Sequence, residues 1–95
     1  FDTDEQVVAL ANDSEYGLSA GIHTGNVGRG MALGEQLEVG LLHINDQTVN
    51  DDGTMPMGGR GASGNGSRHG GPANWDEFTQ WQWTTMRNKA PTYPL

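Results

Sequence analysis

The sequence contains no cysteine, which excludes disulfides, thiolate metal sites and a cysteine nucleophile from these 95 residues. Positive charge is scarce, because five Lys and Arg residues stand against twelve Asp and Glu residues, for a formal net charge of −7. Such a balance disfavours nucleic acid and anionic membranes as partners. Apolar residues make up only 34% of the chain, and no apolar run approaches the length of a membrane span or a signal peptide. We therefore expect a cytoplasmic chain with a thin core.

The first half of the chain predicts a strand, a helix and a second strand. Residues 18–24 alternate apolar and polar side chains, and residues 41–45 form a short apolar run. Between them, Asn26 can cap a helix that extends to about Glu38. This βαβ order predicts two parallel strands with a right-handed crossover. Two parallel strands need neighbours, so they should belong to a larger α/β sheet that is covered on both faces.

Two further helices are predicted near the ends of this unit. Thr3 can cap a helix at the N-terminus, and Gln6, three positions later, completes a capping box. The helix should end near residues 15–17, where Gly17 supplies a turn. Pro72 suits the first turn of a short helix that covers residues 73–78.

Seven of the 15 glycines lie between Met55 and Gly71, in a stretch without a branched aliphatic residue. This density predicts a shaped loop packed closely against other backbone. Within the loop, residues 59–64 match G-x-G-x-x-G, but the strand and helix that flank a dinucleotide fingerprint are missing from the pattern. Arg60 and Arg68 either dock an anion or carboxylate or form salt bridges with the chain's own acids.

Residues 79–87 are rich in β-branched and aromatic side chains and predict a strand. Trp81 and Trp83 fall on the same face of that strand, where a partner subunit would cover them. An extended, proline-containing tail follows to Leu95.

No metal site or catalytic group is predicted from spacing. Residues 50–53 resemble the middle of a calcium loop, but the positions of the first ligand and the closing glutamate hold Thr48 and Gly59. His23, His43 and His69 are scattered, and each is better interpreted as a packed or surface histidine.

Four blocks of sequence, in this order and spacing, resemble the C-terminal part of the aldehyde dehydrogenase superfamily: residues 12–21, 40–45, 55–71 and 78–79. Residues 43–49 and 61–68 are most similar to its aromatic aldehyde branch, the benzaldehyde and vanillin dehydrogenases. The resemblance implies NAD(P)-dependent oxidation of an aldehyde, here aromatic, to a carboxylic acid. In the family the catalytic cysteine, the glutamate, the oxyanion asparagine and the cofactor domain lie upstream of the position of Phe1. The segment alone should therefore be inactive and should bind neither NAD nor NADP.

The resemblance also implies an α/β fold, with residues 1–78 as a segment of a three-layer αβα catalytic domain that includes the glycine-rich loop. Residues 79–95 would be an oligomerisation strand and tail that joins subunits into a dimer or tetramer. Val49, Asn50 and Met57 fall where the family lines its substrate tunnel. The residues expected at the oligomer interface are Gln80, Trp81, Gln82, Trp83, Thr84, Thr85, Met86 and Arg87. One departure is the Ser67-Arg68 pair, which stands where many relatives have Arg-Glu.

Two other interpretations remain open from the sequence. The chain could be a small self-association module that kept the strand and lost the enzyme, or a truncated enzyme without a function of its own. It begins with Phe1 rather than Met, so we expect a processed chain or a piece of a longer one.

Overall fold

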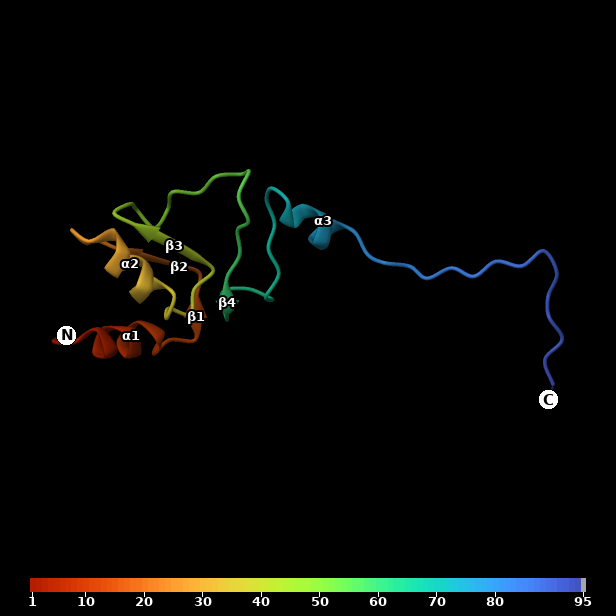
Figure 1. Ribbon diagram of the computed structural model, residues 1–95, viewed down its shortest axis with the longest axis horizontal. Helices are drawn as coiled ribbons and strands as arrows, with labels where there is room; N and C mark the ends of the chain where they lie inside the picture. Colours follow the sequence, from red (N-terminus) through yellow and green to blue (C-terminus); the bar gives the residue numbers. More distant parts are fainter. Residues whose placement is uncertain (95) are drawn as a thin grey trace.

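The computed structural model describes residues 1–94, which form a mixed α/β arrangement followed by an extended tail (Figure 1). The elements, in chain order, are α1 (Asp4–Asn12), β1 (Tyr16–Gly17), β2 (Ser19–Ile22), α2 (Val27–Gly34), β3 (Leu41–Ile44), β4 (Arg60–Gly61) and α3 (Ala73–Phe78). The general α/β class and all three helices expected from the sequence are present. Helices α1 and α2 end some residues earlier than predicted.

Strands β2 and β3 run parallel, with Ser19 opposite Leu41 and Ile22 opposite Ile44, and α2 connects them. The predicted βαβ unit is therefore confirmed. Glycines on α2 let this helix approach the strands closely. A Cβ atom on Gly34 would lie 2.3 Å from Leu42 Cδ2, so a side chain at this position would displace the Leu42 side chain from its place against the helix. The glycine that weakens the helix pattern also allows it to pack.

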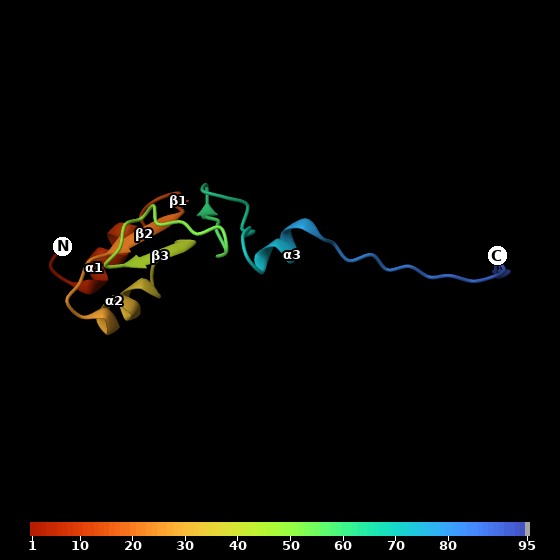
Figure 2. The ribbon, with the colours of Figure 1, turned by 90° about the horizontal axis from the view of Figure 1, so that it is seen from above.

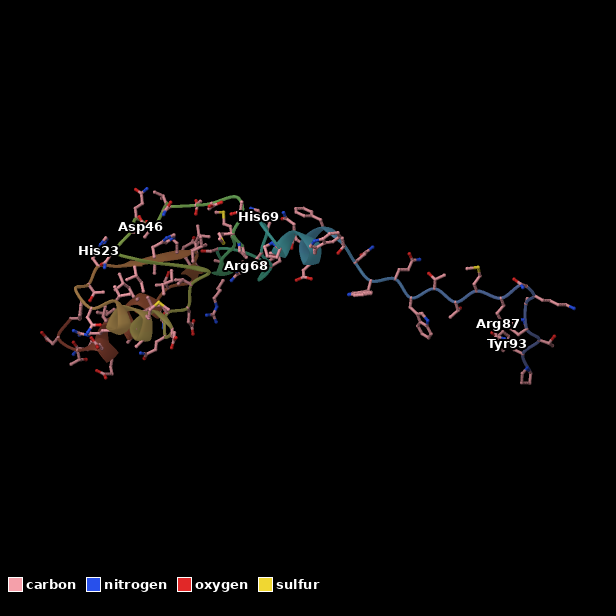
Figure 3. All side chains as sticks on the ribbon, turned by 45° about the horizontal axis from the view of Figure 1, so that its top comes forward. His23, Asp46, Arg68, His69, Arg87 and Tyr93 are labelled. Atoms are coloured by element: carbon pink, nitrogen blue, oxygen red, sulfur yellow. The ribbon has the colours of Figure 1, made fainter. Side chains whose placement is uncertain are left out.

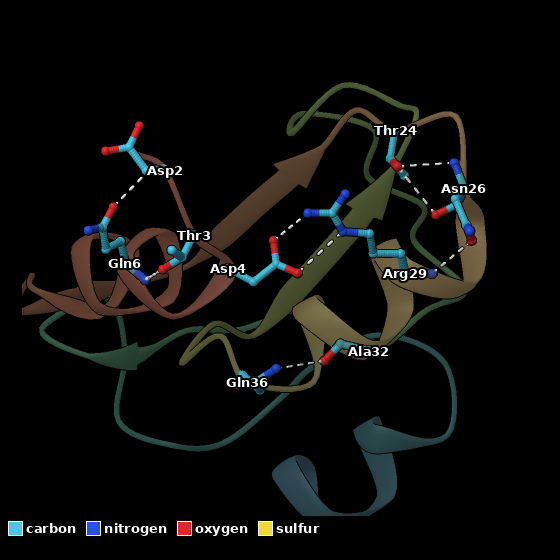
Figure 4. A network of polar contacts seen from close by, with 9 residues as sticks. All are labelled: Asp2, Thr3, Asp4, Gln6, Thr24, Asn26, Arg29, Ala32 and Gln36. Carbon is cyan, nitrogen blue, oxygen red and sulfur yellow. Dashed lines mark hydrogen bonds and ion pairs between the residues drawn. The ribbon is translucent and has the colours of Figure 1, made fainter.

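Both predicted N-caps form (Figure 4). Thr3 Oγ1 accepts a hydrogen bond from the Gln6 backbone N–H at 3.2 Å, and Gln6 Oε1 accepts one from the backbone N–H of Asp2 at 2.8 Å. Asn26 Oδ1 caps α2 by accepting from the Arg29 N–H at 3.0 Å. These bonds satisfy N–H groups that have no partner inside a helix.

The glycine-rich loop, residues 55–71, packs back onto the start of the βαβ unit. Its two-residue strand β4 pairs antiparallel with β1, so that Tyr16 lies opposite Gly61. A Cβ atom on Gly40 would lie only 1.7 Å from the Gly58 carbonyl oxygen. The loop is thus shaped by backbone contact, as predicted, and its one short strand depends on a partner from the N-terminal part of the chain.

The described residues hold no buried hydrophobic side chain. Their radius of gyration is 21.2 Å and their extents are 72 × 31 × 23 Å, whereas a compact domain of this length has a radius of gyration of about 12 Å. Figure 2 shows the cause, because the chain after α3 runs away from the rest. No helix in residues 1–94 is both long and apolar enough to cross a membrane.

Residues 79–94 contain no helix or strand. The predicted strand over residues 79–87 therefore has no hydrogen-bonded neighbour within the described chain. Trp81 and Trp83 are exposed. A strand is defined by its hydrogen bonds with a second strand. The subunit interface from Gln80 to Arg87 therefore stays a prediction, because it concerns an assembly of several chains.

Candidate functional site

The C-terminal ends of β2 and β3 lead into the segment that carries the predicted substrate residues. Asn45 follows β3 with a φ of 58°, a left-handed conformation that asparagine tolerates better than most residues. Its backbone N–H donates to Ile22 O at 2.8 Å, and its Oδ1 accepts from the Thr24 N–H at 2.8 Å. Asn45 therefore ties the two strand ends together and turns the chain into residues 46–50.

Asp46 organises the turn that follows. One of its carboxylate oxygens accepts from the Gln47 N–H at 2.8 Å, and the other accepts from Asn50 Nδ2 at 2.5 Å. The hydrogen bond from Gln47, followed by that from Asn50, holds the pKa of Asp46 below its ordinary value of 3.8. The turn also lies against β2, because Ser19 Oγ donates to Thr48 O at 3.0 Å.

Two of the three predicted substrate residues line one hollow, and the third does not. Asn50 and Met57 line a hollow of about 240 Å³ between β3 and residues 50–57. Val49 does not line it, and its side chain is 71% exposed. Met57 is held in place by its backbone, which exchanges two hydrogen bonds with His69 across the glycine-rich loop.

His43, interpreted from the sequence as a packed or surface residue, lines the same hollow. Its Nε2 atom is buried without a hydrogen-bond partner among residues 1–94. The alternation along β3 indicates the direction of the His43 side chain. Leu42 and Ile44 face the glycines of α2, and alternate residues point to opposite faces of a sheet. His43 therefore faces away from α2.

The two arginines of the glycine-rich loop form no ion pair among the described residues, where the only ion pair joins Arg29 and Asp4 at 2.6 Å. Arg68 instead donates from Nη1 to three loop carbonyls: Ser67 O at 2.8 Å, Gly66 O at 3.2 Å and Gly59 O at 3.4 Å. The salt-bridge interpretation of Arg68 is therefore wrong within this part of the chain, because its guanidinium is used to shape the loop. In Figure 3, Arg68 and His69 lie between the paired strands and α3.

The structure assigns no metal-binding cluster to the described residues. Asp52, in the stretch that resembles a calcium loop, accepts from the N–H and the hydroxyl of Thr54, both at 2.8 Å. After the G-x-G-x-x-G match, the next helix, α3, begins only at Ala73. A dinucleotide fingerprint opens directly into a helix, so this geometry is that of a turn.

The family profile described as "Aldehyde dehydrogenase family" matches residues 1–84. This chain belongs to the aldehyde dehydrogenase family. Among its relatives, a benzaldehyde dehydrogenase [NAD(+)] of Pseudomonas putida is 50% identical over 95 residues, which are 100% of this chain and 20% of that protein. A vanillin dehydrogenase of Amycolatopsis sp. is 50% identical over 96 residues, again 100% of this chain and 20% of the relative.

Solved aldehyde dehydrogenase structures show the same fold. A salicylaldehyde dehydrogenase from Pseudomonas putida G7, complexed with salicylaldehyde, superposes with a TM-score of 0.81 at 35% identity and covers 100% of this chain and 19% of that one. A Mycobacterium tuberculosis aldehyde dehydrogenase complexed with NAD+ gives a TM-score of 0.76 at 38% identity, over 84% of this chain and 16% of that one. The chain thus spans about a fifth of the length of these relatives.

Proposed function

We propose that this chain is the C-terminal segment of an NAD(P)-dependent aldehyde dehydrogenase that oxidises aromatic aldehydes to carboxylic acids. The observation that carries the proposal is the 50% identity to a benzaldehyde and a vanillin dehydrogenase along the whole chain. Family members complexed with NAD+ support the cofactor class. The segment has no cysteine, so the nucleophile and the cofactor site belong to the remaining four fifths of the enzyme.

Within such an enzyme, this segment contributes a wall of the substrate site. Asn50 and Met57 line one hollow, in which an apolar thioether suits an aromatic ring and an amide can select a polar substituent. Residues 1–78 then form the edge of a three-layer catalytic domain. The absence of buried hydrophobic side chains in the described residues fits a piece whose apolar faces are covered by the rest of that domain.

Residues 79–95 supply the subunit contact in this proposal. The stretch Gln80–Arg87 adds as a strand to a partner's sheet, and the partner covers Trp81 and Trp83. Exposed backbone N–H and C=O groups of an extended segment are what such strand addition uses. The assembly in this proposal is a homodimer or a homotetramer built through this strand.

The test is to express the complete coding region that contains these 95 residues and to follow NAD(P)H formation with benzaldehyde and vanillin. We expect turnover with NAD or NADP, and none from the 95-residue chain alone. A chimera in which this chain replaces the matching segment of the Pseudomonas putida relative should keep activity that the truncated relative loses. A coding region without an upstream cysteine and nucleotide-binding domain would contradict the proposal and would favour a self-association module.

A further inference from the structure

The glycine-rich loop carries the one Asn-Gly pair of the chain, Asn65-Gly66, among seven asparagines. Both residues are exposed and lie outside every helix and strand of the described chain. Gly66 has a φ of 90°, and a Cβ atom built on it would meet nothing within 4 Å. Because glycine has no side chain, nothing at this position obstructs an approach to its backbone nitrogen.

The side-chain carbonyl of Asn65 is polarised by Ser67. Asn65 Oδ1 accepts one hydrogen bond from the Ser67 backbone N–H at 3.0 Å and a second from Ser67 Oγ at 2.7 Å. An asparagine in such a turn folds its side chain back over the backbone of the next residue, which here is Gly66. Two donors aimed at one carbonyl oxygen make the carbon electrophilic and stabilise negative charge that develops on the oxygen.

The two nitrogen atoms that would react have no partner within the described residues. Neither the Gly66 backbone N–H nor Asn65 Nδ2 donates a hydrogen bond there. Asn50 differs in both respects, because its Nδ2 donates to Asp46 at 2.5 Å and the residue that follows it is Asp51. A nitrogen without a partner can attack or leave a carbonyl carbon without first giving up a hydrogen bond to the protein.

We propose that Asn65 is a site of spontaneous deamidation in the native enzyme, through a cyclic imide formed with Gly66. The Gly66 nitrogen loses its proton to hydroxide and forms a bond to Asn65 Cγ. The Cγ–Nδ2 bond then breaks, and the nitrogen takes up a proton and leaves as ammonia. Water adds to the imide, and the ring opens to aspartate or to isoaspartate, whose main chain runs through the former side-chain carbon. Nothing is oxidised or reduced, and water is the only co-reactant.

The isoaspartyl product would disturb the part of the loop that Arg68 holds. Arg68 Nη1 donates to the carbonyl oxygens of Gly66 at 3.2 Å and of Ser67 at 2.8 Å, and both carbonyls directly follow the altered bond. The reaction also creates a carboxylate three residues before Arg68, and a carboxylate is a stronger acceptor for a guanidinium than a carbonyl is. Deamidation would therefore change the shape of the loop without any change in the gene.

The first test follows the native full-length enzyme during storage at neutral and at alkaline pH. Peptide mapping by mass spectrometry measures the conversion of Asn65 to aspartate and isoaspartate, and a synthetic peptide of residues 61–69 is the unfolded reference. We expect conversion in the enzyme at least as fast as in the peptide, and faster at alkaline pH. Asn88, which is also exposed but precedes Lys89, should remain an amide. Conversion of Asn65 slower than in the peptide overturns the inference. The readout is mass and not turnover, so it does not depend on the proposed substrate class.

The second test concerns Ser67 as the group that polarises the carbonyl. Ser67→Ala removes the hydroxyl donor and keeps the backbone N–H, so it should slow conversion in the enzyme about fivefold, the scale of one net hydrogen bond. The same substitution in the peptide, where no fold holds the turn, should leave the rate unchanged. Asn65→Gln would have to close a larger ring and serves as the baseline without conversion. An equal rate for Ser67→Ala and the wild-type enzyme overturns the part assigned to Ser67.

Discussion

The pair β2–β3 and the segment 79–87 both have the composition of strands, but only the pair forms a ladder. Ser19–Ile22 finds Leu41–Ile44 in the same chain, in register and parallel. The segment 79–87 finds no strand within the described residues and leaves Trp83 91% exposed. The difference shows that a strand pattern becomes a strand only where a second backbone is supplied. For the first region a crossover helix brings that backbone, and for the second the described residues supply none.

The largest loss of stability should come from breaking the backbone contact between Gly58 of the glycine-rich loop and Gly40, which directly precedes β3. Gly40→Ala would place a Cβ 1.7 Å from the Gly58 carbonyl oxygen and 2.8 Å from its carbonyl carbon. Backbone cannot yield as a side chain does, so we expect a loss of about 4 kcal/mol or more in the free energy of unfolding. Denaturant unfolding of the full-length enzyme measures it.

The matched control is Gly25→Ala, because a Cβ at that glycine meets nothing within 4 Å. Its unfolding midpoint should stay close to that of the wild type. Equal midpoints for the two variants would show that the loop does not depend on this contact.

A smaller free-energy change, in subunit association, is expected from a substitution in the unpaired segment 79–87. If Gln80–Arg87 joins a partner's sheet, Trp83→Ala should weaken subunit association by about 2 kcal/mol, the scale of an interface hot spot. Sedimentation velocity over a dilution series measures the shift towards monomer. Tyr93→Ala removes an exposed aromatic side chain outside the predicted strand and should leave the association constant unchanged. Identical dissociation of both variants would count against strand exchange through this segment.

The same contrast explains how much of the structure the sequence predicts. Local signals predict local features correctly: the alternation over residues 18–24, and the caps at Thr3 and Asn26, all correspond to observed elements. Helix α2 ends at Gly34, earlier than predicted, and Gly34 lies against Leu42, a contact that spacing along a helix does not reveal. Arg68 is misjudged because its carbonyl partners exist only once the loop has closed.

The candidate site divides in the same way. The resemblance to a family identifies Asn50 and Met57 as candidate residues. The four-residue spacing of Asp46 and Asn50 is compatible with a hydrogen bond between them within a turn. The burial of His43 Nε2 cannot be anticipated from the sequence, because alternation along a strand tells which face a side chain takes and not what covers that face.

The smallest effect should come from the exposed ion pair between α1 and α2, which tests whether side-chain charges add to what backbone packing provides. Arg29 Nη2 lies 2.6 Å from Asp4 Oδ1 (Figure 4), and the hydrogen bond from Arg29 lowers the pKa of Asp4 below its ordinary value of 3.8. A lowered pKa means that the folded state favours the carboxylate. The contribution of this ion pair to stability is therefore full above the unfolded pKa of about 3.8 and is lost as the pH falls through the lower folded value.

Asp4→Asn should lower Tm slightly at neutral pH. The difference should be largest at low salt, because salt screens exposed ion pairs, and it should vanish in acid. Asp2→Asn removes a neighbouring charge that forms no ion pair among residues 1–94. A Tm difference of the same size and pH dependence in that variant would assign the effect to net charge rather than to the contact with Arg29.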